Sequence, residues 1–219
     1  MSRDFNGTTQ FAQLAAAPAA TPLTLAAWVR ADSAAGSGKA LVCVCGAAFH
    51  YQLLGLSTAL GKWYCGSRAG GSEYYAASTT AVSTGVWVHV AAVFASATSR
   101  AVFVNGVSEG SNATSTTPTL TRTAIASRND GAVPGSFPSY FDGQMAHVAI
   151  WGAALTAAQI AGLAAGMSPL VVSSTAPWLY APFRGESFPE VNFSGTAVTL
   201  SPTSSEAAKG TSDPRLYPA

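Results

Sequence analysis

Short segments whose apolar residues recur with a period of two run through most of the chain. In residues 23–30 the odd positions are all apolar (Leu, Leu, Ala and Val), whereas the even positions include Thr and Arg. Residues 86–95 repeat this design with both faces largely apolar, as expected of a strand that lies between two packed sheets. Because successive side chains of an extended chain point to opposite faces, both segments are predicted to be β-strands.

The same pattern predicts further strands, separated by turns rich in Gly, Ser, Thr and Pro. They are expected at residues 40–45, 49–56, 62–65, 73–77, 100–104, 120–126 and 144–151. Asn105-Gly106 follows one of them, and this dipeptide favours a two-residue hairpin turn because both positions accept positive φ.

One helix is predicted near residues 155–165. Thr156 and Gln159 have the spacing of a capping box, and Gly166 is placed to end the helix. About ten strands and one short helix predict an all-β fold, a two-sheet antiparallel jelly-roll sandwich.

Composition narrows the classes of partner. Of the 219 residues 48% are hydrophobic and only 10% are charged, against about 25% charged in an average domain. The net charge of +1 comes from scattered residues without a basic stripe, so we expect no nucleic acid as partner. The longest apolar stretch, residues 155–167, is too short to cross a bilayer, so we expect no membrane insertion.

The N-terminus and the cysteines bear on localisation. Residues 1–5 carry no apolar signal region, and the 3 cysteines are too few for a disulfide framework. The sequence therefore predicts a protein without a signal peptide that is assembled in a reducing cytoplasm with all its thiols free.

Several segments, taken in order, are similar to a known family. Residues 5–11, 23–30, 87–94 and 101–106 resemble successive strands of laminin-G-like, concanavalin A-like lectin-glucanase domains, and residues 141–160 resemble that family's closing strand and helix. The resemblance covers about residues 1–166, so we expect a laminin-G-like jelly-roll domain at residues 1–167. It implies a sandwich that binds ligands or builds assemblies.

The C-terminal segment, residues 168–219, departs from that family's order. Residues 178–183 resemble the strand that usually opens such domains, yet here they come last. We expect them to fill the vacant strand position beside their own sheet or that of a neighbouring subunit, with the remainder forming an extended surface arm. This tail and residues 166–170 resemble concanavalin-like proteins encoded by tailed phages and prophages, which implies a virion protein.

Catalytic machinery is not predicted. Glycan cleavage would need two facing carboxylates, and no two of the 10 acidic residues share a predicted strand. Ser108 fits the Gly-x-Ser-x-Gly pattern of hydrolases, but it follows a hairpin turn and precedes no helix. We therefore expect no enzyme and no catalytic residue.

Two sets of residues are candidates for a metal site, and no cofactor is expected. Cys43, Cys45, His50 and Cys65 are residue types that bind zinc, but Cys-Val-Cys within an apolar strand lacks the tight turn of structural zinc sites. The family resemblance suggests calcium at the sandwich rim, for which the candidates are Asp32, Asn129 and Asp130. Calcium needs six to eight oxygens, so these acids are too few and no metal is expected.

Aromatic residues are the remaining candidates for a ligand surface. The four candidates lie in polar strands near Gly-rich turns; they are Trp63, Tyr64, Tyr74 and Tyr75. An exposed ring in such a place can stack on a sugar. Alternation should bury one of each adjacent pair. Trp28 and Trp87, in apolar strands, are expected in the core, and His89 and His147 are expected to be structural residues with satisfied hydrogen bonds.

Three functions stay open at this point. The leading hypothesis is a non-enzymatic structural or binding component of a phage-like particle (capsid decoration, fibre or tail) that contacts other virion proteins and itself as a homo-oligomer. The alternatives are a free-standing carbohydrate-binding lectin, which could coexist with the first as attachment to cell-surface glycans, and a glycan-cleaving enzyme.

Overall fold

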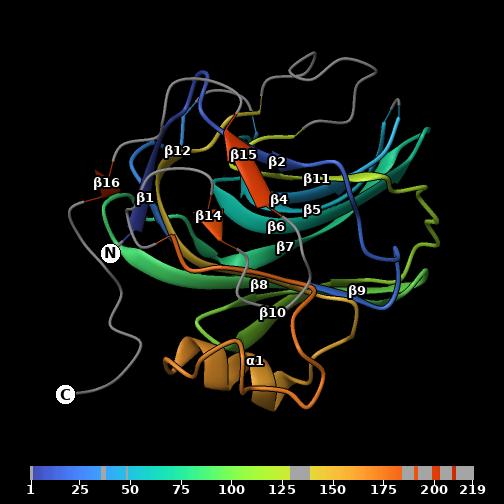
Figure 1. Cartoon of the computed structure of the whole chain (residues 1–219). Coiled ribbons are helices and arrows are strands. Elements are labelled where there is room, and N and C mark those ends of the chain that lie inside the picture. Colours follow the sequence, from blue (N-terminus) through green and yellow to red (C-terminus); the bar gives the residue numbers. More distant parts are fainter. Residues whose placement is uncertain are drawn as a thin grey trace.

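Two antiparallel β-sheets lie face to face, and one short helix covers the outer face of one of them (Figure 1). The computed structural model describes residues 2–35, 38–47, 49–128 and 139–183, together with the strand pieces 190–191, 199–202 and 209–210. The predicted fold class, an all-β antiparallel sandwich with a single short helix, is confirmed for this described part of the chain.

The first sheet carries the helix. Its strands are β1 (Ser2–Asn6), β3 (Leu23–Ala31), β8 (Trp87–Ser96), β9 (Ser99–Val104), β10 (Val107–Asn112), β12 (Asp142–Trp151), β13 (Leu179–Ala181) and β16 (Lys209–Gly210). They are ordered β10-β9-β8-β3-β12-β1-β16, with β13 also paired to β12.

The second sheet lies across the core from the first. Its strands are β2 (Ala12–Leu14), β4 (Lys39–Cys45), β5 (His50–Ser57), β6 (Lys62–Ala69), β7 (Glu73–Ala81), β11 (Arg122–Ile125), β14 (Glu190–Val191) and β15 (Thr199–Pro202). They are ordered β14-β15-β2-β11-β4-β5-β6-β7.

The period of two in β3 and β8 decides which side chains meet between the sheets. The apolar odd positions of β3 are fully buried, and Val88, Val90, Ala92 and Phe94 of β8 join them in the main core. The opposite face of both strands is the outer face of the first sheet. Trp28 and Trp87 lie on that outer face and are only partly buried, so the expectation that they belong to the core was wrong.

The hairpin between β9 and β10 has the predicted turn. Asn105 and Gly106 have φ values of 48° and 85°, the left-handed conformation that a two-residue turn of this twist requires. The strand β10 continues through Ser108, so the Gly-x-Ser-x-Gly pattern forms a hairpin and not a strand-to-helix elbow.

The helix α1 (Ala157–Ala164) begins and ends as its sequence predicts. The Thr156 side chain accepts a hydrogen bond from the Gln159 amide, and the Gln159 side chain accepts one from the Thr156 amide. At the other end Gly166 has a φ of 95°, and the Met167 amide donates to the carbonyl of Gly162.

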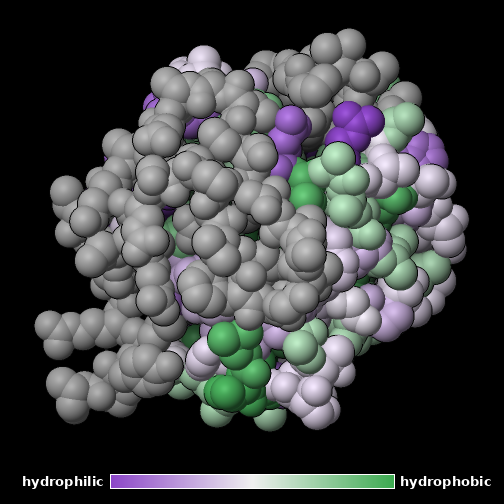
Figure 2. Space-filling view, in the orientation of Figure 1, coloured by the Kyte–Doolittle hydropathy of each residue, from purple (hydrophilic) through white to green (hydrophobic). Residues whose placement is uncertain are grey.

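The buried face of α1 packs on the outer face of the first sheet. Ile160 and Leu163 contact a second apolar cluster that includes Phe103 and Trp151. In Figure 2 apolar surface is visible at the end of the molecule where α1 lies. Within the described residues no helix has the length and hydropathy to cross a membrane.

The tail contributes a strand, β13, to the first sheet. β13 pairs with residues 148–150 of β12, whereas β1 pairs with residues 142–145 of the same strand. The two short strands therefore occupy successive parts of one edge of β12, which would otherwise expose unpaired backbone groups. Leu179, Ala181 and Phe183 are fully buried in the main core.

We expect Phe183→Ala to destabilise the fold strongly. The Phe183 ring is fully buried and packs edge-on against Phe5, with ring centroids 5.9 Å apart. Its loss would leave a cavity that costs about 3–5 kcal/mol of unfolding free energy, measured by urea titration. Val171→Ala is the control, because Val171 is 70% exposed and should change the unfolding free energy by less than about 0.5 kcal/mol. Similar values for the two variants would show that the tail is not part of the core.

Candidate functional site

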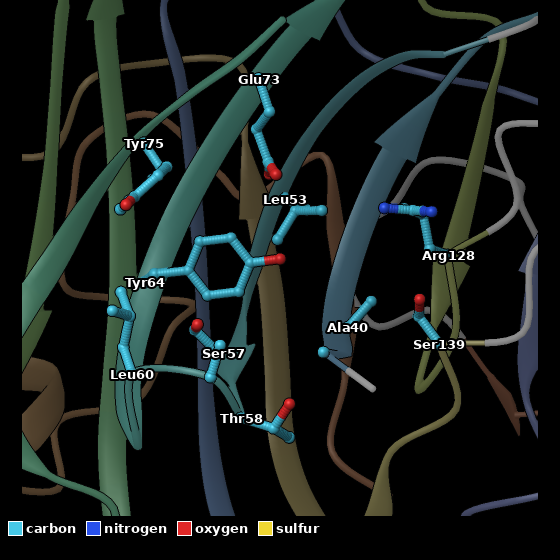
Figure 3. Close-up of a pocket in the computed structure, with 12 residues that line it drawn as sticks. Ala40, Leu53, Ser57, Thr58, Leu60, Tyr64, Glu73, Tyr75, Arg128 and Ser139 are labelled. Atoms are coloured by element: carbon cyan, nitrogen blue, oxygen red, sulfur yellow. The ribbon is translucent and has the colours of Figure 1, made fainter. Parts of the chain in front are cut away.

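A groove with a volume of about 400 Å³ crosses the outer face of the second sheet. Strands β4 to β7 form its floor, and residues just after β11 and before β12 form one side (Figure 3). The side chains that determine its chemistry are Ala40, Leu53, Tyr64, Glu73, Tyr75 and Arg128.

Two glycines on the outer face of the sheet let neighbouring groups lie close to its backbone. In register, Gly66 lies between Leu53 and Tyr75, and Gly55 lies beside Tyr64. Directly opposite residues of an antiparallel pair share a face, so both glycines open onto the outer face. A Cβ atom on Gly66 would lie 2.2 Å from Oε1 of Glu73, which shows that this carboxylate occupies the place of the absent side chain.

Three polar groups converge over an apolar floor. Figure 3 shows the Glu73 carboxylate and the Tyr64 hydroxyl directed toward the space above Leu53, with the Arg128 guanidinium on the opposite side. Burial raises the pKa of the Tyr64 phenol, and the negative charge of Glu73 raises it further. Tyr64 is therefore a neutral hydroxyl that can both donate and accept a hydrogen bond.

Aromatic rings hold the two guanidinium groups of this region. Arg128 lies over the Tyr51 ring at 5.2 Å from its centroid, and Arg68 lies over the Phe49 ring at 4.3 Å. Arg68 also donates from Nε to the carbonyl of Gly71 at 2.5 Å, and it pairs in register with Glu73. Burial raises the pKa of Tyr51, Glu73 adds to this, and Arg128 and Arg68 oppose it, so all three charged groups lie near one phenol.

The four aromatic candidates are divided by strand alternation. Tyr64 and Tyr75 line the groove, with ring centroids 6.3 Å apart at 90°. Trp63 is buried in the core between the sheets, where its ring does not reach the groove. Tyr74 projects from the other side of β7 and is 38% exposed, so the expectation that one tyrosine of this pair would be buried was wrong. The groove therefore brings together only one member of each predicted pair.

Sequence reasoning missed two groove residues. Glu73 was placed in the correct strand, and its alternation with Tyr75 was a signal that both share a face. Arg128 had no such signal, because only the pairing of β11 with β4 brings it beside the groove.

Of the three calcium candidates, the structure describes only Asp32. Asp32 is exposed and lies 3.7 Å from the guanidinium of Arg30, whereas Asn129 and Asp130 lie outside the described residues. Strand pairing nevertheless gathers Asp4, Asp32 and Asp142, a cluster that the sequence did not reveal. Burial raises the pKa of Asp4, and the charges of Asp32 and Asp142 raise it further. Among the described residues, no three His, Cys, Asp or Glu side chains are arranged to hold a metal ion.

The zinc hypothesis fails on geometry. Cys43 and Cys45 do share a face, as predicted, and both belong to the small apolar cluster under the groove. Cys65 belongs to the main core on the opposite face of the same sheet, so the three sulfurs cannot meet at one ion. All three are buried and form no disulfide, as expected of cysteines that act as small apolar residues.

The two strand histidines differ in their hydrogen bonds. His147 Nδ1 lies 2.8 Å from the Tyr180 hydroxyl, so this nitrogen has a hydrogen-bond partner, as expected. His89 is 2% exposed beside Trp28, and its Nδ1 has no hydrogen-bond partner among the described residues. The expectation of satisfied hydrogen bonds was therefore wrong for His89, because no polar group of the described residues lies within hydrogen-bond reach of this nitrogen.

Comparison with known proteins identifies the same fold. The family model described as "Concanavalin A-like lectin/glucanases superfamily" matches residues 6–161. No curated protein matches the chain in sequence.

Several solved structures are similar to this one. A heptameric SAP-like pentraxin from Limulus polyphemus superposes with a TM-score of 0.64 at 16% identity, over 91% of this chain and 93% of that one. A putative carbohydrate binding protein from Bacteroides ovatus has the same TM-score, 0.64, and identity, 16%, over 93% and 58%. Domain 4 of an extracellular arabinanase from Geobacillus stearothermophilus, solved with arabinotriose, gives 0.60 at 18% identity, over 74% and 76%.

The thiols should be unreactive in the native protein. Burial raises the pKa of Cys65 to about 12, and the thiolate is the reactive form. We expect a disulfide reagent to find no thiol within minutes under native conditions and 3 free thiols per chain after denaturation. Ser99→Cys, at an exposed position, is the positive control. Rapid native reaction of a wild-type cysteine would contradict the buried placement.

The stability of the fold should decrease in mild acid because of His89. Burial lowers the pKa of His89 from 6.5 to about 3, so below pH 6.5 the unfolded chain binds a proton that the folded chain does not. The unfolding free energy should then fall by about 1.4 kcal/mol per pH unit, until the pH reaches the folded pKa. Between pH 7 and 5, His89→Gln should reduce the slope of the unfolding free energy against pH by the equivalent of about one bound proton. An unchanged slope would mean that His89 is protonated in the folded protein.

Proposed function

The chain belongs to the concanavalin A-like lectin/glucanase superfamily, and from that premise we propose that it is a carbohydrate-binding module whose ligand site is the groove on β4 to β7. Fold membership by itself does not assign a ligand, so the proposal depends on the chemistry of the groove.

The observation that carries the proposal is the combination of one exposed ring with convergent polar groups. The Tyr75 ring is 46% exposed at the groove, where the C–H face of a sugar ring can stack on it. The Glu73 carboxylate can accept hydrogen bonds from sugar hydroxyls, the Arg128 guanidinium can donate, and the Tyr64 hydroxyl can do both. A few polar groups around an apolar floor are typical of small-molecule sites.

Two structural neighbours support the same ligand class. The Bacteroides ovatus protein is described as a putative carbohydrate binding protein, and the arabinanase domain was solved with arabinotriose. Their identities of 16% and 18% establish a common fold only, so they support the proposal without locating the site.

The proposed module binds without cleaving. Hydrolysis of a glycosidic bond needs two carboxylates about 5–9.5 Å apart across the bond. Among the described residues that line the groove, Glu73 is the one carboxylate. We propose likewise that no metal ion takes part, since the ligand groups named above need none.

A role on a phage-like particle stays a prediction. The expected virion location, the contacts with other virion proteins and the homo-oligomer depend on the resemblance of the tail, and glycan attachment at the groove is compatible with them. Exposed apolar side chains after α1, namely Met167, Leu170 and Val171, add surface that suits protein contacts.

Tyr75→Ala should weaken glycan binding, whereas Tyr74→Ala should not. The two tyrosines are adjacent and both exposed, but only Tyr75 lines the groove. Loss of a stacking ring should raise the Kd of a bound oligosaccharide about tenfold or more. A glycan array would identify the ligand, and calorimetry would compare the variants. Equal losses in both variants, or binding by neither the wild type nor the variants, would contradict the proposal.

A further inference from the structure

We propose that a small cavity beneath α1 is a binding site for one water molecule, which bridges Trp28, His89 and Trp151 by hydrogen bonds. The site joins the three neighbouring strands β8, β3 and β12 under the helix. It is independent of the glycan groove, because the cavity lies on the outer face of the first sheet and the groove lies on the outer face of the second.

The floor of the cavity lies on a row of small residues. Ala26 of β3 lines the cavity, and in register it lies between Ala91 of β8 and Ala149 of β12. Two residues away on each strand, where side chains return to the same face, the cavity is lined by large rings: Trp28, His89 and Trp151. The first two are cross-strand partners on one side of the row, and the third lies on the other side, so the rings face the cavity from both ends.

The helix and the residues after it cover the cavity. Leu163 lies on the buried face of α1, and Met167 and Pro169 follow the end of the helix. The space that remains has a volume of about 10 Å³. One water molecule needs roughly 10–15 Å³. A sugar or another small organic molecule is too large, so water is the occupant whose size matches.

Three ring nitrogens of the lining residues lack a partner in the protein. Nε1 of Trp28, Nδ1 of His89 and Nε1 of Trp151 are buried and have no hydrogen-bond partner among the described residues. Trp151 is fully buried, and His89 is 2% exposed. Polar groups withdrawn from solvent are costly unless they form hydrogen bonds. Buried water molecules typically bind to two to four such groups, so three convergent nitrogens indicate a water site.

The hydrogen-bonding chemistry of the lining matches water and excludes ions. An indole nitrogen only donates, whereas a neutral imidazole has one nitrogen that donates and one that accepts. Burial lowers the pKa of His89 to about 3, so its ring is neutral near pH 7. A water molecule accepts from both indoles and donates to Nδ1 of His89, which satisfies all three nitrogens. An anion would face the lone pair of the imidazole, and a cation would face two N–H groups.

Nuclear magnetic resonance on the full chain tests the site directly. We expect rotating-frame cross-peaks from water to the indole protons of Trp28 and Trp151, with the sign of a bound water molecule and not of passing solvent. The nitrogen chemical shift of His89 Nδ1 should be that of a nitrogen that accepts a hydrogen bond. These spectra need no variant, so they decide the question even where a substitution prevents folding.

Two matched variants locate the water molecule. Trp28→Phe removes one of the three hydrogen bonds, so the residence time of the water should shorten about tenfold, as measured by magnetic relaxation dispersion. Trp87→Phe makes the same chemical change on the same outer face but outside the cavity lining, and it should leave the residence time unchanged. Equal melting temperatures would establish that both variants are folded.

Three results would overturn the inference. A scalar coupling between Nε1 of Trp28 and Nδ1 of His89 would show that the two rings bond directly with no water between them. Absence of the water cross-peaks would show that the cavity is dry. An unchanged residence time in Trp28→Phe would show that the bound water lies elsewhere. None of these results concerns the groove, so carbohydrate binding would stand or fail separately.

Discussion

Packing of the two sheets against each other is the constraint on which the rest of this structure depends. β3, β8 and β12 bury one face of the first sheet against β4, β5 and β6 of the second. Because side chains alternate along a strand, burying one set of residues necessarily sends the next set outward. On the first sheet the outward set is covered by α1, and on the second sheet it forms the groove.

The groove is thus a product of the same alternation that builds the core. Trp63 and Tyr64 are neighbours in the chain, yet one fills the core and the other lines the groove. Gly66 takes an outward position in β6 without filling it, and the Glu73 carboxylate lies over that position. A methyl group there would displace the carboxylate, so this glycine decides where the acid of the groove lies.

Charge is scarce in this chain, which makes its location informative. Only 10% of the residues are charged, yet Arg68, Glu73 and Arg128 lie around a single buried phenol. Desolvation of such groups is costly unless they pair with one another or with a ligand. A structural sandwich of this size could be built without them, and their gathering at a groove is the reason to infer a function there.

The sequence by itself determined the features that depend on neighbouring residues. The strands β3 and β8, the Asn105-Gly106 turn and the cap of α1 at Thr156 follow from periodicity, positive φ and a local hydrogen bond. It also determined that Tyr64 and Trp63 would point to opposite faces of their strand, and likewise Tyr75 and Tyr74. Only the tertiary structure decided that these two rings share a groove with Arg128, and that Asp4, Asp32 and Asp142 meet at another edge. The reason is physical, because register and strand order are set by the packing of two whole sheets and by backbone pairing between distant segments, which no local pattern encodes.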